Sequence, residues 1–545
     1  MSENAVVWSY ANAWEPIAKL QPQEPVVLQG DKRLNWGEFD AQADALAARF
    51  LAAGLKHNSK VATYLFNCAE YLTSTYAAFK AGLAPFNVNY RYTADELLYL
   101  FDNADAEAVV FHAGFADRIE EIRARLPLVR VWIAVEEPGH AAPAWAETYE
   151  RVVANVPAKR PTIAPWGRSN DDLLILYTGG TTGMPKGVMW RQEDQLGVTG
   201  FGGSVLLGIP PLERPEQAAE RIALFPKRIG LVACPLMHGT GLFSALMTLL
   251  AGGAVSLLPH RHFDAADLWD EVHRHRVTSL AIVGLPFAQP MLEALERNPG
   301  RWDLTCVTSI GSSGAMWSQE NKKALLTFIP QAMLTDAFSS SEAVGMGLSV
   351  STAAGESQTA AFVTGPETVV FTEDHRRVQP GSGERGMTAV GGFLPLGYYK
   401  DDEKTRRTFP TIEGRRWSIP GDWATVEADG SLRLLGRGSQ CINTGGEKVF
   451  PEEVEEALKR HPAVRDAAAI GAPDPRFGER VCAVVELQPG AAEPSLSELA
   501  AHVKEHLADY KAPRALVILD SLGRAPNGKM DYKTVKARAL ERLGA

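Results

Sequence analysis

Apolar and polar positions alternate in two different ways along the first third of the chain. Segments 31–55 and 70–83 place apolar residues at the spacing of a helix, whereas 60–66 (KVATYLF) is a short, nearly continuous apolar run. The same change from a helix-like to a strand-like pattern recurs at 98–112 and 268–284. Strands separated by helical stretches of roughly 10–15 residues are typical of βαβ units. The sequence therefore predicts an α/β fold, with a large N-terminal domain of mainly parallel sheets flanked by helices.

A new alternation of helix-like and strand-like segments begins near the end of the chain. After the loop-like segment 432–451, the residues EEVEEALKRHPAVRDAAAIG (452–471) indicate a new helix followed by a new strand. We therefore expect the large domain over residues 1–436, a connection at 437–440 and a small α+β domain over 441–545.

One uncharged stretch, 242–259 (LFSALMTLLAGGAVSLLP), is just long enough to suggest a membrane span. Gly252, Gly253 and Pro259 interrupt it in a way that favours a buried helix, a turn and a strand, so no transmembrane segment is expected. The first 20 residues lack a basic segment followed by an apolar one, and no signal peptide is expected either.

Composition narrows the classes of function. The chain has 46% hydrophobic and 22% charged residues, which is typical of a folded globular protein. Its 65 acidic residues outnumber the 55 basic ones, which argues against a nucleic-acid partner because such proteins usually carry a basic surplus. The five cysteines form no C-x-x-C pair, so neither a disulfide framework nor a zinc site is indicated, and a reducing, cytoplasmic location is expected.

Two partial patterns are set aside. HRHFD (260–264) has no further set of ligands at a usable spacing and is interpreted as a solvated loop instead of a metal cluster. No G-x-S-x-G sequence is present, so the nucleophile elbow of a serine hydrolase is not supported.

The strongest chemical signal is segment 173–190, LLILYTGGTTGMPKGVMW. Its apolar run predicts a buried strand that leads into a loop of glycines and threonines, with a lysine close behind. Glycines let backbone N–H groups converge on an anion and threonine hydroxyls add donors, so this segment is predicted to bind a polyphosphate. It is not a Walker A loop, because Gly187 follows the lysine where Ser or Thr is required. The candidate phosphate-binding residues are Thr178, Gly179, Gly180, Thr181, Thr182, Gly183 and Lys186.

The stretch YTGGTTGMPKGV (177–188) closely resembles the signature of the acyl-adenylate-forming superfamily, which includes acyl-CoA synthetases, peptide-synthetase adenylation domains and beetle luciferases. Segments that resemble the other family motifs follow in the expected order between about residues 25 and 535. The resemblance implies a two-step ligation, in which a carboxylate attacks the α-phosphate of ATP to give acyl-AMP and the CoA thiol then takes the acyl group. It also implies a mobile C-terminal domain that rotates about Gln440, where the family commonly has an acid or a lysine.

The resemblance assigns nucleotide and metal roles to matching positions. In DAFSSSEAVG (336–345), where Ser339 replaces the family glycine, Phe338 would stack on adenine and Ser341 would contact phosphate. Glu342 and Thr178 would hold Mg²⁺, and Lys529 in RAPNGKMDY (524–532) would enter the site for adenylation. The other nucleotide contacts would be Ser313, Gly314 and Ala315 in SIGSSGAM (309–316), Asp336, Asp422 in IPGDW (419–423), and Arg437.

A second set of positions would meet the acyl group and CoA. His238 in PLMHGTG (235–241) would border the acyl pocket and the route of the thiol. The apolar stretch 197–212 is interpreted either as a border of the same pocket or as a packed helix. The remaining channel residues would be Gly311, Gly445, Gly446 and Lys448, and a plain surface lysine is an equal interpretation of Lys448.

The implied cofactors and partners are ATP, Mg²⁺, CoA and a small-molecule carboxylate. GGTTGMPKGVMWRQED (179–194) looks most like bacterial ligases for long-chain fatty or steroid side-chain acids. The alternatives are an aryl or medium-chain acid, and an acyl-AMP ligase that passes the acyl group to a separate carrier protein. A non-catalytic nucleotide-binding module would lack Glu342 or Lys529, and both are present. The sequence leaves open whether the chain forms a homodimer or associates weakly with membranes.

Overall fold

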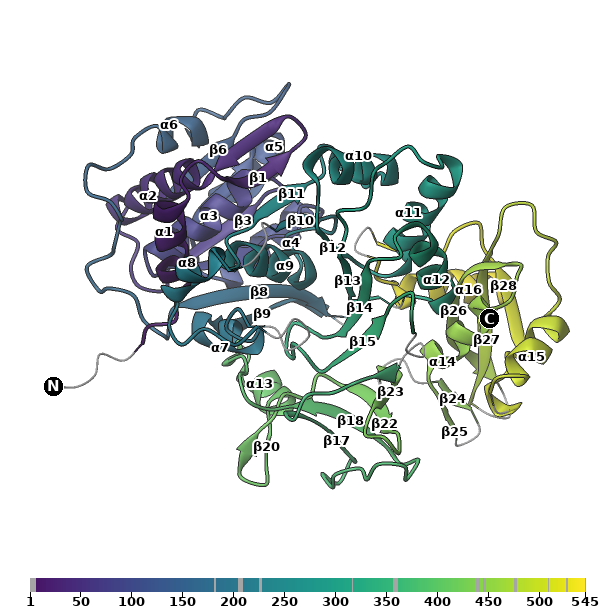
Figure 1. Cartoon of the computed structure of the whole chain (residues 1–545). Helices are drawn as coiled ribbons and strands as arrows, with labels where there is room; N and C mark the ends of the chain where they lie inside the picture. Colours follow the sequence, from purple (N-terminus) through teal and green to yellow (C-terminus); the bar gives the residue numbers. More distant parts are fainter. Residues whose placement is uncertain are drawn as a thin grey trace.

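The computed structural model describes residues 6–180, 183–203, 209–224, 228–315, 317–355, 361–437, 442–444, 447–474, 478–507, 509–525 and 528–544. The fold consists of two large sheets with helices around them, whose strands come from interleaved segments of the chain, a third sheet and a small C-terminal domain (Figure 1). The helices are α1 (Tyr10–Leu20), α2 (Trp36–Ala52), α3 (Ala69–Lys80), α4 (Ala94–Asn103), α5 (Ala116–Arg123), α6 (Tyr149–Val153), α7 (Gln192–Val198), α8 (Gln217–Ile222), α9 (Gly239–Leu250), α10 (Ala265–His275), α11 (Leu285–Arg297), α12 (Gln319–Phe328), α13 (Asp402–Thr408), α14 (Pro451–Lys459), α15 (Leu496–Lys504) and α16 (Tyr532–Leu543).

The first large sheet has the strand order β19-β9-β8-β4-β3-β5-β6-β7. The six strands from β8 to β7 are parallel to their neighbours, and β9 and β19 are antiparallel additions at the β8 edge. Its strands are β3 (Lys60–Tyr64), β4 (Ala84–Asn87), β5 (Ala106–His112), β6 (Val131–Val135), β7 (Glu147–Thr148), β8 (Leu173–Gly180), β9 (Gly183–Arg191) and β19 (Gly397–Tyr398).

The second large sheet has the order β15-β14-β13-β12-β10-β11-β1-β2, and only its edge strands β15 and β2 are antiparallel. Strands such as β11 are buried along their whole length, as expected for parallel strands covered by helices on both faces. The prediction of mainly parallel sheets is confirmed for this part of the chain. The strands are β1 (Pro25–Gln29), β2 (Lys32–Asn35), β10 (Ile229–Val232), β11 (Ala254–Leu257), β12 (Ser279–Ile282), β13 (Ser309–Ser313), β14 (Met333–Phe338) and β15 (Gly347–Ser351).

A third, fully antiparallel sheet with the order β16-β23-β22-β18-β17 was not predicted from the sequence. It lies below the two large sheets in the view of Figure 1. Its strands are β16 (Ala361–Phe362), β17 (Thr368–Phe371), β18 (Arg385–Val390), β22 (Asp422–Val426) and β23 (Leu432–Arg437), and the hairpin β20 (Thr411–Ile412)–β21 (Arg415–Arg416) precedes β22.

The C-terminal part is an α+β unit, as predicted. Its sheet pairs β25-β24-β27-β26 antiparallel, and β28 joins β27 in parallel. The expected connection at 437–440 is only partly covered, because residues 438–441 lie outside the described residues. The strands are β24 (Ile442–Thr444), β25 (Glu447–Val449), β26 (Val464–Asp474), β27 (Gly478–Leu487) and β28 (Ala515–Ile518).

Strand pairing and a helix cap set where the helix predicted within 31–55 begins. The helical pattern of 31–55 starts later than expected, because 32–35 pair as β2 and Asn35 caps α2. Asn35 Oδ1 accepts the N–H of Glu38 at 2.8 Å, and the Glu38 carboxylate accepts the N–H of Asn35 at 3.0 Å, which is a complete capping box.

Segment 242–259 forms most of α9, a turn and β11, as predicted. Among the described helices, none is both long and apolar enough to cross a bilayer.

Candidate functional site

The predicted phosphate loop is the tip of the β8–β9 hairpin. The two strands pair antiparallel, with Thr178 opposite Lys186 and Gly180 opposite Gly183, and Gly179 lies between the paired positions. Thr181 and Thr182, which come between the two strands in sequence, lie outside the described residues. A hairpin, and not a strand that runs into a helix, therefore carries this loop, in agreement with the absence of a Walker A sequence.

Asn87 at the end of β4 fixes β8 just before the hairpin tip. Its side-chain N–H₂ donates to the carbonyl oxygens of Tyr177 at 2.8 Å and Met237 at 2.7 Å. Its side-chain oxygen accepts the N–H of Tyr177 at 2.7 Å. One buried amide thus ties β8 to the segment that immediately precedes His238, so the two predicted site segments are held side by side.

Lys186 is paired with an acid. Its ammonium group forms an ion pair with Asp401, the residue that caps α13. The hydrogen bond from Lys186 lowers the pKa of the Asp401 carboxyl group below its ordinary value. The lysine is thus positioned on β9 with its charge partly neutralised, next to the hairpin tip.

His238 lies at the start of α9. Burial, with smaller contributions from the positive charges of Lys529 and Arg91, lowers the pKa of its imidazole to about 3. The ring is therefore neutral at physiological pH. The influence of Lys529 on His238 also shows that the C-terminal lysine and this histidine share one electrostatic environment, although almost 300 residues separate them in sequence.

The carboxyl ends of parallel strands β12, β13 and β14 meet at one edge of the second sheet, where ligands of open α/β sheets usually bind. Gly311 and Ser313 are in β13, and Gly314 follows at φ +92°. A Cβ atom at Gly314 would lie 3.7 Å from Val283 Cγ1 and 3.8 Å from Thr240 Oγ1, so the turn runs close to the segments after β12 and at the start of α9. Ala315 is the last residue described there.

Asp336 in β14 has a structural partner. It forms an ion pair with Lys322 of α12, and burial raises the pKa of its carboxyl group despite this pairing. A second contact, with the hydroxyl of Ser312, acts in the opposite direction. The nucleotide role of Asp336 stays a prediction, and the structure adds that this carboxylate fastens β14 to α12.

The hydroxyl and acidic residues after β14, Ser341 and Glu342, are held by partners that sequence reasoning missed. Tyr398 Oη donates to Glu342 Oε1 at 2.7 Å, and Ser418 Oγ donates to the carbonyl oxygen of Glu342 at 2.7 Å. The indole N–H of Trp190 donates to the carbonyl oxygen of Ser341 at 3.0 Å. The side chain of Glu342 is thus oriented, and carboxylate and hydroxyl oxygens are the ligand types that Mg²⁺ prefers.

Phe338 is buried and packs against Phe362 with a ring-centroid distance of 5.4 Å. Both belong to a small apolar cluster that includes Leu394. Asp422 opens β22, is 7% exposed and lies opposite Arg437 of β23 in the strand register. The predicted adenine and ribose residues therefore come from the second and third sheets.

The turn before Lys529 contacts the large domain. A Cβ atom at Gly528 would lie 3.1 Å from both Cγ1 and the carbonyl oxygen of Val283 and 3.2 Å from Pro286 Cγ. Arg524 supports the turn, because its Nη1 donates to the carbonyl oxygen of Gly528 at 3.1 Å while its Nε pairs with Asp466 at 2.6 Å. This arrangement brings the C-terminal turn to the strand-end edge described above.

Three residues that are predicted to contact CoA lie wholly or partly outside the described residues. Gly445 and Gly446 lie outside the described residues, as does the side chain of Lys448. The side chain of Arg437 is likewise outside them.

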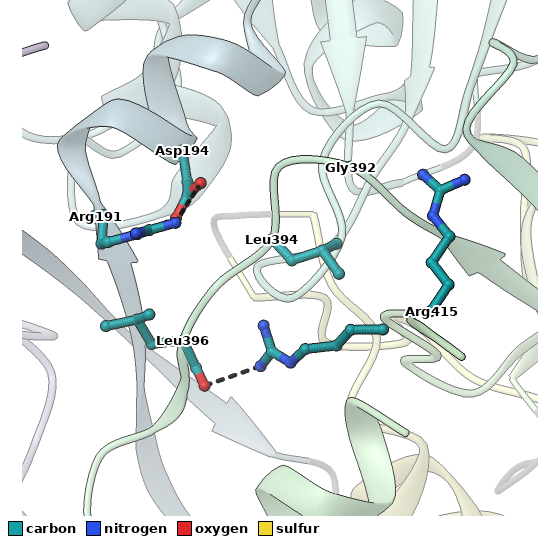
Figure 2. A pocket seen from close by; sticks show the side chains of 7 residues that line it. Arg191, Asp194, Gly392, Leu394, Leu396 and Arg415 are labelled. Atoms are coloured by element: carbon teal, nitrogen blue, oxygen red, sulfur yellow. Dashed lines mark hydrogen bonds and ion pairs between the residues drawn. The ribbon is translucent and has the colours of Figure 1, made fainter. Parts of the chain in front are cut away.

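A cavity of about 270 Å³ lies between the end of β9, α7, the loop before β19 and the β20–β21 hairpin (Figure 2). Arg191 in its wall pairs with Asp194 at 2.6 Å, and Arg416 donates to the carbonyl oxygens of Pro395 and Leu396 at 2.7 and 2.9 Å. The first contact joins the end of β9 to α7, and the second joins the β20–β21 hairpin to the loop before β19.

The geometry and the sequence pattern together identify a class of protein. The AMP-binding enzyme family matches residues 14–399, and the AMP-binding enzyme C-terminal domain matches residues 453–529. The chain belongs to the AMP-binding enzyme family.

Individual relatives are similar over nearly the whole chain. A medium/long-chain-fatty-acid–CoA/3-oxocholest-4-en-26-oate–CoA ligase of Mycolicibacterium smegmatis is 40% identical over 96% of this chain and 94% of its own. A 3-oxocholest-4-en-26-oate–CoA ligase of Rhodococcus rhodochrous is 38% identical over 96% and 95%. Among solved structures, an anthranilate CoA ligase, AuaEII, in complex with anthranoyl-AMP shares the fold with a TM-score of 0.84 at 19% identity, over 100% of this chain and 99% of its own.

Proposed function

We propose that this protein is an ATP-dependent acid–CoA ligase that forms a thioester through an acyl-AMP intermediate. Its substrate is a long-chain fatty acid or a steroid side-chain carboxylate. Two observations support the proposal, in a chain 40% identical to a ligase named for such acids. Tyr398, whose strand pairs with β9 of the hairpin, holds Glu342. The turn before Lys529 contacts Val283 just after β12.

The first step brings two anions together, so the protein must mainly position them and neutralise charge. The backbone of the 178–183 hairpin would hold the phosphates, and Lys529 would stabilise charge at the α-phosphate as the carboxylate attacks. Phe338 and Asp422 would hold adenine and ribose. An ionised carboxylate suits a vicinal diol because it accepts a hydrogen bond from each hydroxyl.

Mg²⁺ fits this site, and Glu342 and Thr178 would hold it. The metal would neutralise phosphate charge when bound. Two residues of the chain support these proposed ligands. Tyr398 orients the Glu342 carboxylate, and Asn87 fixes the strand that carries Thr178.

In the second step the CoA thiol attacks the acyl carbon and AMP leaves. The His238 ring, which burial keeps neutral, would border the route of the thiol without adding charge near the acyl carbon. We propose that the C-terminal domain rotates about 437–440 between the steps, so that Lys529 withdraws and Gly445, Gly446 and Lys448 approach the pantetheine arm. Lids and domain motions of this kind commonly separate half-reactions.

Incubation with ATP, Mg²⁺ and a panel of fatty, steroid side-chain and aryl acids, with and without CoA, tests the proposal. AMP and a CoA thioester should appear together and only with the long-chain or steroid acids. Acid-dependent pyrophosphate release without thioester would instead favour transfer to a carrier protein, and no turnover with any acid would refute the ligase assignment.

The supply of ATP and CoA also leads us to propose the cytoplasm as the location of the protein.

A further inference from the structure

The end of α15 carries two histidines and a glutamate in the sequence H-V-K-E-H (502–506). Helical hydrogen bonding continues past the last residue assigned to α15, because the N–H of Leu507 donates to the carbonyl oxygen of Val503 at 2.9 Å. His502 and His506 are therefore one helical turn apart, and residues at this spacing lie on the same face.

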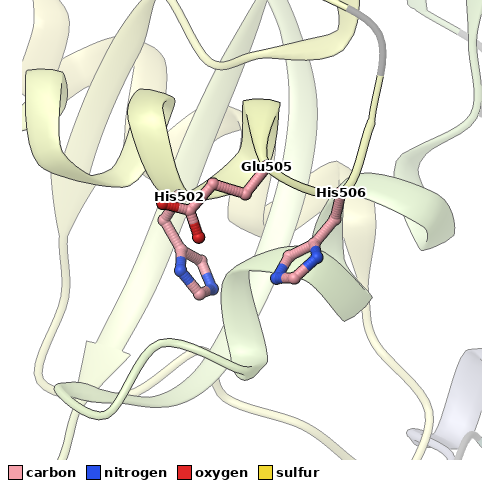
Figure 3. Close-up of side chains that lie close together, drawn as sticks. All are labelled: His502, Glu505 and His506. Atoms are coloured by element: carbon pink, nitrogen blue, oxygen red, sulfur yellow. The ribbon is translucent and has the colours of Figure 1, made fainter.

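The three side chains converge on one point of the surface (Figure 3). One ring nitrogen from each of His502 and His506 and one carboxylate oxygen of Glu505 all lie within 4.8 Å of one another. Glu505 and His506 are exposed and His502 is half-buried, so a cation can reach them from solvent. Imidazole nitrogens together with a carboxylate oxygen are a ligand set for divalent transition metals such as Zn²⁺.

Neighbouring groups hold the His502 ring. Its Nε2 lies 3.0 Å from the carbonyl oxygen of Ala457 in α14, and because a carbonyl oxygen only accepts, Nε2 carries the ring proton. Nδ1 then keeps the lone pair that a metal requires. Metal-binding histidines commonly donate their other N–H to a carbonyl oxygen in this way. The ring of His461 packs edge-to-face against His502 at a centroid distance of 5.2 Å, which limits its rotation.

We infer that His502, Glu505 and His506 form a binding site for a divalent transition-metal cation, with solvent completing the coordination. The site is separate from the Mg²⁺ site proposed at Glu342, because α15 lies at the outer edge of the small domain, far from β14 and β15 (Figure 1). A metal held there links the residues at the two ends of the last helical turn. Because it binds the folded state and not the unfolded one, it stabilises the small domain against unfolding.

Zinc binding to the full-length, metal-stripped protein, without a polyhistidine tag and with millimolar Mg²⁺ present, tests the inference. Equilibrium dialysis with Zn²⁺ is expected to give one saturable equivalent per chain. His506→Ala and Glu505→Gln should each weaken it at least about tenfold. His262→Ala removes an exposed histidine from the 260–264 loop and is the matched control, with zinc binding as in the wild type. The unfolding temperature should rise with zinc for the wild type and the control and stay constant for His506→Ala.

Two results would overturn the inference. Equal zinc affinity in the wild type and His506→Ala would mean that the metal binds elsewhere, and the lack of a saturable equivalent would mean that the three side chains do not act together. The readout is zinc binding and not turnover, so a failure of the proposed ligase function would leave this result unchanged.

Discussion

Gly528 offers a direct test of whether the observed domain arrangement serves adenylation. It lies in the turn that presents Lys529, with φ +74°, and a Cβ atom there would lie 3.1 Å from the carbonyl oxygen of Val283 and 3.2 Å from Pro286 Cγ. Both neighbours belong to the large domain. The contact therefore exists only while the turn is inserted.

Gly528→Ala adds two free-energy costs, and a control variant separates them. The left-handed backbone costs about 1–2 kcal/mol for an L-residue in any domain arrangement. The close approach to Val283 and Pro286 adds about 1–3 kcal/mol, typical of overpacking, but only in the inserted arrangement. At 1.36 kcal/mol per factor of ten, adenylation should fall about fivefold to 160-fold. Gly523→Ala is the matched control, because Gly523 also has a positive φ of +66° while the nearest atom to its Cβ, Arg538 Nη1, is 3.8 Å away.

Acid-dependent exchange of pyrophosphate into ATP measures the first step, and thioester formation from supplied acyl-AMP and CoA measures the second. Gly528→Ala should slow exchange relative to Gly523→Ala and leave thioester formation within about threefold of it. If the two variants showed the same exchange rate, or if Gly528→Ala slowed both steps equally, the reasoning would be wrong.

Three further changes test other parts of the account. Lys529→Ala removes the ammonium group proposed to act at the α-phosphate, so adenylation should fall at least about a hundredfold while thioester formation from acyl-AMP changes far less; equal losses in both steps, with folding intact, would reject this role. Tyr398→Phe deletes the donor to Glu342 and should raise the Mg²⁺ concentration for half-maximal adenylation about tenfold, whereas an unchanged Mg²⁺ dependence would contradict the proposed metal site. Burial lowers the pKa of His112 to about 3, and its Nδ1 accepts the N–H of Phe66 at 3.2 Å. Since the unfolded imidazole, with a pKa of 6.5, binds a proton that the folded ring excludes, folding stability should fall below that pH, by about 2 kcal/mol at pH 5. Urea unfolding at pH 7 and pH 5 should show a smaller loss for His112→Asn than for the wild type, and parallel losses would refute this cause.

The parts of the fold that could be predicted are those whose pattern is local. The β8 run and the Thr178–Gly183 loop are contiguous, and α9 with β11 follows from one uncharged stretch that two glycines divide. The third sheet was missed because its strands are short and two of its pairings join strands far apart in sequence, β16 with β23 and β18 with β22. Such pairings are decided by tertiary packing and leave little periodicity in the sequence.

The same limit applies to the candidate site. The resemblance to the acyl-adenylate-forming superfamily pointed to Glu342, but its donor Tyr398 lies 56 residues away and only folding brings them together. The ion pair between Asp336 and Lys322 and the low pKa of His238 likewise depend on burial and on neighbours from other segments. The GYY sequence at 397–399 was a signal that could have drawn attention to this tyrosine, since an aromatic hydroxyl near a predicted acidic site is a natural donor.

Transfer of an oxygen isotope tests the central claim most directly. With the acid substrate labelled with ¹⁸O in its carboxylate, attack on the α-phosphate and later loss of AMP to the thiol leave one labelled oxygen on the phosphate of AMP. The account predicts AMP carrying one ¹⁸O atom for each thioester formed. Unlabelled AMP, or label found in inorganic phosphate with ADP as the other product, would contradict it.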